Sequence, residues 1–192
     1  MNATPHPDPA TPEIRPGTHL DPDAGACLME LVSVAAGAAW SDHPSCTHPL
    51  VAHLARRVND ALSDTSRQQL RPLVPVLARS GPAGLGSFAA ICLACTSYTL
   101  QQRPSWTVLQ LHSLAVRHSR RPQRNWLYEH GAAYRTMEIC VSALTRLPSD
   151  RADQALTGLL LHAISALNPV LASGSVRGEK PHSTPPIRSS VG

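Results

Sequence analysis

The sequence predicts an all-α fold: a single bundle of about six to seven helices with disordered N- and C-terminal tails. Apolar residues make up 42% of the 192 residues, but they are mainly Ala, Leu and Val, with only three Trp, three Tyr and one Phe. This composition favours closely packed helices over β-sheets, whose strands are enriched in β-branched and aromatic residues. Apolar residues also recur at the three- and four-residue spacing of a helix face, and we find no convincing strand.

Both ends of the chain are expected to be disordered. Residues 1–22 carry six prolines and almost no apolar side chains, and residues 173–192 are rich in Pro, Ser and Gly. Segments of this kind cannot bury enough apolar surface to offset the entropy that is lost on ordering. We therefore expect one helical domain over residues 23–172.

Prolines set several of the expected helix boundaries inside this domain. Pro22 suits the first turn of the first helix and Pro49 that of the second. Pro72 and Pro75 should kink or break the third helix. The expected helices cover about residues 23–39, 49–62, 64–78, 85–101, 105 into the basic run 117–124, 123–147 and 150–166.

The fourth and sixth helices carry specific predictions about burial. The fourth is apolar nearly all round from Phe88 to Leu100, which is typical of a central buried helix. On the sixth helix, Trp126, Leu127 and Tyr134 are expected to face inward.

The sequence contains no targeting or membrane signal. Its first residues lack the basic and apolar regions of a secretory signal, and the longest apolar stretch is too short to cross a bilayer. We therefore expect a soluble cytoplasmic protein with no membrane partner. The five cysteines are an odd number and should stay reduced in that compartment.

Charge is distributed unevenly along the chain, whose formal net charge is +4. Residues 1–30 hold one basic and five acidic side chains, whereas residues 103–151 hold eight basic and three acidic ones. The basic segment could form ion pairs with the acidic residues 1–30, or it could bind an anionic partner.

The segment from residue 25 to residue 62 has the densest group of chemically capable side chains in the sequence. Four of its residues are candidate metal ligands: Cys27, Glu30, His43 and Cys46. Zinc favours four ligands drawn from Cys, His and carboxylate, and short spacings help chelation. No standard zinc-finger spacing is present, however, so zinc is a possible cofactor and no other cofactor is indicated.

Two other interpretations of this segment stay open. In a structural one, Asp42 caps the turn and Glu30 accepts backbone N–H groups, while the cysteines are buried packing residues. In a catalytic one, Cys46 or Cys27 acts as a nucleophile, with His43 or His48 as its base and an acid that orients the base. Glu30, Asp42 and His43 are also candidate binding residues for a partner.

Three short motifs lie in the same segment: C-L-M-E at residues 27–30, S-D-H-P-x-C at residues 41–46 and N-D at residues 59–60. With these motifs the chain resembles a group of short helical proteins from GC-rich bacteria and their phages. The resemblance covers about residues 25–77 and implies a shared helical domain. The group has no established activity, so the resemblance implies no reaction or substrate.

A C-x-x-C motif, Cys92 and Cys95, lies in the middle of the apolar fourth helix. Such a pair can be redox-active or bind zinc, but a thioredoxin-like function needs a βαβ context that is absent. Buried packing thiols are the favoured interpretation, because free cysteine is among the most often buried residues.

A basic run at residues 117–124 contains the candidate binding residues Arg120, Arg121 and Arg124. Aromatic residues follow it, and arginines beside aromatics can contact phosphates and stack on bases. A solvated connection between two helices is the simpler interpretation, and contact with another anionic partner is a third. Farther along the sixth helix, His130, Tyr134 and Glu138 recur every four residues and could form a polar network at the edge of the core.

These observations favour a small cytoplasmic helical binding or regulatory module, without catalytic activity, that engages a protein or anionic partner. The first alternative is a metal-binding or thiol-dependent enzyme centred on Cys27, Glu30, His43 and Cys46. The second is a nucleic-acid-associated regulator that uses the basic run.

Overall fold

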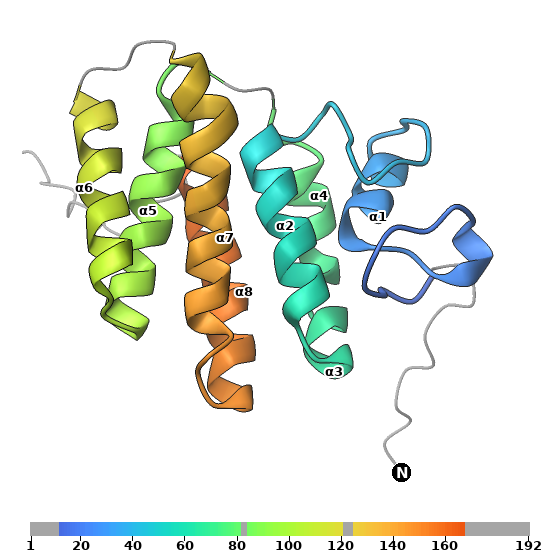
Figure 1. Ribbon diagram of the computed structural model, residues 1–192. Coiled ribbons are helices and arrows are strands. Elements are labelled where there is room, and N and C mark those ends of the chain that lie inside the picture. Colours follow the sequence, from blue (N-terminus) through green and yellow to red (C-terminus); the bar gives the residue numbers. More distant parts are fainter. Residues whose placement is uncertain (1–11, 82–83, 121–124, 168–192) are drawn as a thin grey trace, which may run out of the picture.

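The computed structural model describes residues 12–81, 84–120 and 125–167, and its helices confirm the all-α prediction (Figure 1). The α-helices are α1 (Leu28–Ala35), α2 (Pro49–Ala61), α3 (Asp64–Gln68), α4 (Val74–Leu77), α5 (Ser87–Gln102), α6 (Trp106–Arg120), α7 (Ala133–Leu144) and α8 (Ser149–Leu167). The shorter elements are the 3-10 turns η1 (Pro22–Ala24) and η2 (Arg71–Leu73) and a π-helical turn, η3 (Tyr128–Ala132), that runs directly into α7.

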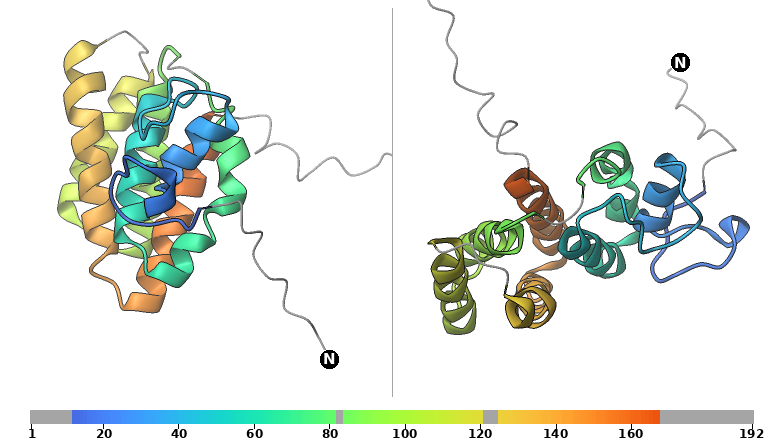
Figure 2. Two further views of the ribbon diagram at one scale, coloured as in Figure 1. Left: turned by 90° about the vertical axis from the view of Figure 1, so that its right-hand side faces the viewer. Right: turned by 90° about the horizontal axis from the view of Figure 1, so that it is seen from above.

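The helices form two staggered layers, with α6, α7 and α2 in one and α5, α8 and α4 in the other (Figure 2). Helix α5 packs against α6, α7, α8 and α2, and its residues Ile91, Cys92 and Cys95 are fully buried. The prediction of a central buried helix at residues 85–101 is therefore confirmed. Helix α1 lies at the opposite end of the molecule from α6.

Helix α1 is shorter than the predicted helix over residues 23–39, because side-chain and backbone signals stop it at both ends. Cys27 begins it: its Sγ accepts a hydrogen bond from Glu30 N at 3.4 Å, and Glu30 Oε2 accepts one from Cys27 N at 2.7 Å. This reciprocal pair is a capping box. Gly37, with a φ of +69°, takes the left-handed conformation that ends helices.

Residues 12–26, which we call the N-terminal strap, are ordered and packed against α1 and α2, so the prediction that residues 1–22 form a disordered tail is wrong for residues 12–22. Ile14 is 1% exposed, and its backbone N–H and C=O both pair with the Gln68 amide, at 3.1 and 2.7 Å. The strap closes on itself where Arg15 N donates to Ala26 O at 2.8 Å. Backbone groups of the strap thus find partners on α3 and within the strap itself.

The remaining predictions about the tails lie outside the described residues. They concern residues 1–11 and 173–192, expected to be disordered, and residues 168–172, expected to belong to the domain.

The prediction that Trp126 and Leu127 face inward is wrong, since they are 68% and 74% exposed. The cause is the π-helical turn η3, in which Ala133 N donates to Tyr128 O, five residues back. Such a turn holds one more residue than an α-helical turn, so every residue before it is rotated by about 100° relative to a regular helix. The regular helical spacing that places Tyr134 and Met137 on the inward side of α7 therefore does not apply to the residues before η3.

Helix α2 begins at Pro49, as predicted, and a buried histidine caps it. His48 is fully buried, and its Nδ1 accepts a hydrogen bond from Leu50 N at 3.2 Å. Nδ1 therefore carries no proton, so Nε2 carries it and donates to Ser87 Oγ at 2.8 Å. Burial lowers the pKa of His48 to about 4, because the charged form would lose its hydration.

We predict that His48 makes the fold sensitive to mild acid. Its folded pKa of about 4 lies below the ordinary 6.5, so its stabilisation is complete above pH 6.5 and is lost as the pH falls towards 4. At pH 4.5 this loss amounts to about 2.5 kcal/mol of unfolding free energy. Urea denaturation at pH 7 and pH 4.5 measures it.

The matched control is His48→Asn, which keeps a capping side chain but does not titrate. The wild type should lose about 2.5 kcal/mol more than this variant between the two pH values. An equal loss in both proteins would contradict the assignment of a buried neutral His48.

Candidate functional site

Glu30 is fully buried and anchors the strap to the first turn of α1. Besides the bond from Cys27 N, its Oε1 accepts a hydrogen bond from His19 N at 2.6 Å, and its Oε2 lies 3.1 Å from His19 Nδ1. Trp40 covers this contact and donates from Nε1 to His19 O at 2.7 Å. The Glu30 carboxylate, a candidate binding group and metal ligand, is thus hydrogen-bonded by other groups of the chain. This favours the structural interpretation.

Asp42 joins the strap to the turn before α2. Its Oδ1 lies 2.6 Å from His43 Nδ1, and its Oδ2 accepts a hydrogen bond from Thr18 Oγ1 at 3.0 Å. Partial burial would raise the pKa of Asp42, but the hydrogen bonds from His43 and Thr18 and the nearby Arg56 outweigh it and hold this pKa below its usual value. The charged Asp42 therefore orients the His43 ring, which remains 69% exposed.

The N-D motif has a structural function that the sequence did not reveal. Asn59 is fully buried, where its Oδ1 accepts a hydrogen bond from Leu28 N at 3.3 Å and its Nδ2 donates to Arg15 O at 2.8 Å. Asp60 Oδ1 accepts one from Gly17 N at 2.8 Å. The sequence does contain a signal for these contacts: an Asn in the interior of a helix. Asn disfavours helix interiors unless its side chain has hydrogen-bond partners elsewhere.

The four candidate zinc ligands divide among different contacts. Cys27 and Glu30 meet in the capping box, His43 pairs with Asp42, and Cys46 Sγ lies 3.8 Å from Thr47 Oγ1. Among residues 12–81, 84–120 and 125–167, no group of three or more His, Cys, Asp or Glu side chains is placed to hold a metal ion.

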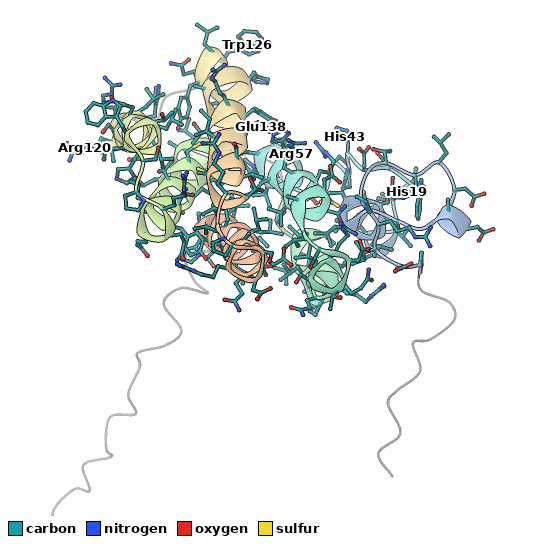
Figure 3. All side chains as sticks on the ribbon, turned by 60° about the horizontal axis from the view of Figure 1, so that its bottom comes forward. His19, His43, Arg57, Arg120, Trp126 and Glu138 are labelled. Carbon is teal, nitrogen blue, oxygen red and sulfur yellow. The ribbon has the colours of Figure 1, made fainter. Side chains whose placement is uncertain are left out.

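A cleft of about 640 Å³ lies between the turn that carries His43, the first half of α2 and the start of α7. We call it the α2/α7 cleft, and Figure 3 shows His43 on the side of the turn and Glu138 near Arg57 at the α7–α2 junction. Its lining consists of His43, Pro44, Ser45, Thr47, Pro49, Ala52, His53, Arg56 and Tyr134.

His53 connects the cleft to an ion pair between α2 and α7. Its Nε2 lies 2.9 Å from Glu138 Oε1, but the contact is poorly aligned, and this buried nitrogen has no hydrogen-bond partner among the described residues. Glu138 also accepts a hydrogen bond from Arg57 Nε at 3.0 Å. Burial lowers the pKa of His53 and outweighs Glu138, which raises it. Tyr134 packs edge-on against the His53 ring, with centroids 5.0 Å apart.

Arg56 fixes the other wall of the cleft. Its Nη1 donates to the backbone oxygen of Asp42 at 2.6 Å, which ties α2 to the turn before it. The formal charges of Arg56 and Arg57 balance those of Asp42 and Glu138. The two histidines therefore decide the charge of the site: it is near neutral when they are neutral and positive when they are protonated.

Neither His53 nor Arg56 stands out in the sequence as a site residue. Their spacing of three residues puts them on one side of α2, just as the spacing of four puts Tyr134 and Glu138 on one side of α7. The sequence of each helix thus shows only that its own two residues share one side. The pairing of the two helices is a tertiary contact between residues about 80 positions apart, and no local pattern encodes it.

A second hollow, of about 570 Å³, lies between α3 and α8. Its main carboxylate, Asp153, accepts hydrogen bonds from the side chain and backbone of Ser63, the N-cap residue of α3. Asp153 therefore stabilises the start of α3, and the hollow is a weaker candidate site.

The thiols are poorly suited to nucleophilic chemistry. Burial raises the pKa of Cys27 and Cys92 to about 12 and that of Cys140 to about 11, and it also raises the pKa of Cys95. All five cysteines are free thiols, and only Cys46 is partly exposed. Because the thiolate is the reactive form, the C-x-x-C pair behaves as core packing.

The basic run is only partly described. Arg120 ends α6 on the surface, and Figure 3 shows it at the opposite end of the molecule from His19. Arg121 and Arg124 lie outside the described residues. The nucleic-acid hypothesis stays a prediction.

A comparison with protein-family models, curated proteins and solved structures finds no match to this chain. The resemblance carried by residues 27–60 therefore stays a prediction. Within the described part of the chain, no helix combines the length and apolar character that crossing a bilayer requires.

We predict that Glu30→Gln destabilises the protein by about 3 kcal/mol, because the amide leaves His19 and Cys27 with unmatched buried polar groups. Chemical denaturation measures this loss, and Trp40 fluorescence should report a loosened strap. The control is Glu13→Gln, which alters an exposed pair with Arg15 and should change stability by less than about 1 kcal/mol. Equal effects of the two variants would contradict the anchoring function of Glu30.

We predict that only Cys46 reacts quickly with a thiol reagent in the folded protein, whereas all five cysteines react in denaturant. The buried thiols have raised pKa values and little thiolate at neutral pH. Absorbance of the released reagent counts the reactive groups. Cys46→Ser should abolish the fast phase; fast reaction at Cys27 or Cys92 would revive the thiol-dependent alternative.

Proposed function

We propose that this protein is a binding module that holds an anionic ligand in the α2/α7 cleft, without chemistry of its own. The observation that supports the proposal is the convergence of His43, His53 and Arg56 on one cleft, with a carboxylate beside each histidine. The metal-binding and thiol-dependent alternatives lack a comparable convergence among the described residues.

The carboxylates prepare the two histidines to act as donors. A histidine whose ring contacts a carboxylate is held in one orientation. Asp42 does this for His43 and Glu138 for His53. An anion that enters the cleft would then accept hydrogen bonds from groups that are already positioned, which lowers the entropy lost on binding.

Arg56 is a cleft-lining residue that stays positively charged whether or not the histidines are protonated. The contact of Nη1 with Asp42 O holds the guanidinium in place and leaves its other N–H groups as possible donors to a ligand. Charge-assisted hydrogen bonds to such a group are about twice as strong as neutral ones. A cytoplasmic location, in which the five free thiols stay reduced, is part of the proposal.

Anion binding should be coupled to proton uptake. The site becomes more positive when His53 is protonated, and burial holds the pKa of His53 below its ordinary value, so affinity should rise as the pH falls below about 6.5. The groups that face His53 are Glu138, Tyr134 and the two arginines of α2, and the group that faces His43 is Asp42. Sulfate is a suitable probe because it stays a dianion over this range.

We therefore predict that sulfate binds at least about tenfold more tightly at pH 5 than at pH 8, which corresponds to about 1.4 kcal/mol, because the lowered pKa of His53 places its protonation below about pH 6.5. Amide NMR titrations at constant ionic strength, followed at residues 43–56 and 134, measure the affinity. Arg56→Gln should weaken binding by at least about tenfold. Arg117→Gln removes an exposed arginine of α6, away from the cleft, and should leave binding unchanged.

Two outcomes would overturn the proposal. One is a set of sulfate- and phosphate-induced shifts that do not centre on the cleft. The other is an equal loss of affinity in Arg56→Gln and Arg117→Gln, which would indicate general charge attraction in place of a site.

A further inference from the structure

The size of the α2/α7 cleft argues for a ligand larger than a simple anion. Its volume of about 640 Å³ is typical of pockets that hold drug-sized or cofactor-sized molecules. A sulfate or phosphate ion alone would fill only a small part of it. The cleft therefore has room for a larger molecule that carries the anionic group at one end.

The lining is divided between a polar part and a less polar part. His43, His53 and Arg56 supply the polar part, whereas Pro44, Pro49 and Ala52 offer mostly apolar surface. Tyr134 adds an aromatic ring that is half-buried and contacts the His53 ring edge-on at 5.0 Å. A ligand that satisfies both parts carries its charge on a ring or another flat apolar body.

The arrangement of donors favours a phosphoryl group over a carboxylate. Three donors line the cleft: His43 from the turn, and His53 and Arg56 from α2. A phosphate monoester presents three peripheral oxygens, so each of these donors can meet one of them. A carboxylate has only two oxygens in one plane and would leave one donor without an acceptor.

We infer that the ligand of the α2/α7 cleft is a nucleoside monophosphate, with its phosphate against His43, His53 and Arg56 and its base against the Tyr134 ring. The inference rests on the proposed function and narrows it to one class of compound. Base–aromatic contacts tolerate any base, because every base has a π-face. The structure thus assigns the class and leaves the base open.

The experiment compares AMP, ribose 5-phosphate, inorganic phosphate and adenosine by calorimetry and by amide NMR on the full chain. AMP should bind at least about tenfold more tightly than inorganic phosphate or ribose 5-phosphate, in line with the known contribution of base stacking on an aromatic side chain. Adenosine should bind more weakly than AMP by a similar factor, since it lacks the phosphate.

Variants separate the two halves of the site. Tyr134→Leu should reduce AMP affinity to that of inorganic phosphate and leave phosphate binding unchanged. Unchanged phosphate binding in Tyr134→Leu shows that this variant is folded, and Tyr134→Phe, which keeps the ring, should retain the preference for AMP. Arg56→Gln should weaken AMP and inorganic phosphate alike, and Arg117→Gln should weaken neither.

Each contrary result has its own meaning. AMP that binds no more tightly than inorganic phosphate, or only as tightly as ribose 5-phosphate, would overturn this inference but leave the anion-binding proposal standing. Adenosine that binds as tightly as AMP would also overturn it. Absence of any binding by sulfate and inorganic phosphate at the cleft would overturn the proposed function itself.

Discussion

The buried carboxylate of Glu30 is the constraint on which the N-terminal third of the structure depends. A buried carboxylate is tolerated only when its oxygens are satisfied, and Glu30 meets this condition by accepting from both the start of α1 and the strap. The strap then brings Thr18 to Asp42, and Asp42 orients His43 at the mouth of the cleft. A group with no direct contact to the cleft thereby determines the position of one of its donors.

The opposite wall of the cleft depends on a contact between distant parts of the chain. Glu138 of α7 meets both His53 and Arg57 of α2. These groups are partly exposed, so their pairing adds little to stability. It joins two helices whose side chains line the same cleft. Stability comes instead from the apolar packing of α5 against its neighbours.

Local sequence patterns predicted the helices but not the site. Pro49 marked the start of α2, and the continuous apolar pattern of residues 88–100 marked the buried α5, because both signals act within a few residues. The order of residues 12–22 and the α2/α7 cleft arise from side chains that are far apart in sequence. His43 was identified because it lies in a dense polar turn, whereas His53 and Arg56 look like ordinary residues of an amphipathic helix until α7 packs beside them.

The π-helical turn η3 also bears on how this helix tolerates insertions and deletions. An i to i+5 turn accommodates one surplus residue without breaking the helix, so residues 126–144 contain one residue more than a regular helix of the same length would. Removing a residue from 128–132 would restore regular α-helical hydrogen bonding. The residues before the deletion, Trp126 and Leu127 among them, would then rotate by about 100°, away from their present exposed positions. The direction in which the two side chains point is thus set by chain length in a neighbouring turn rather than by their own chemistry.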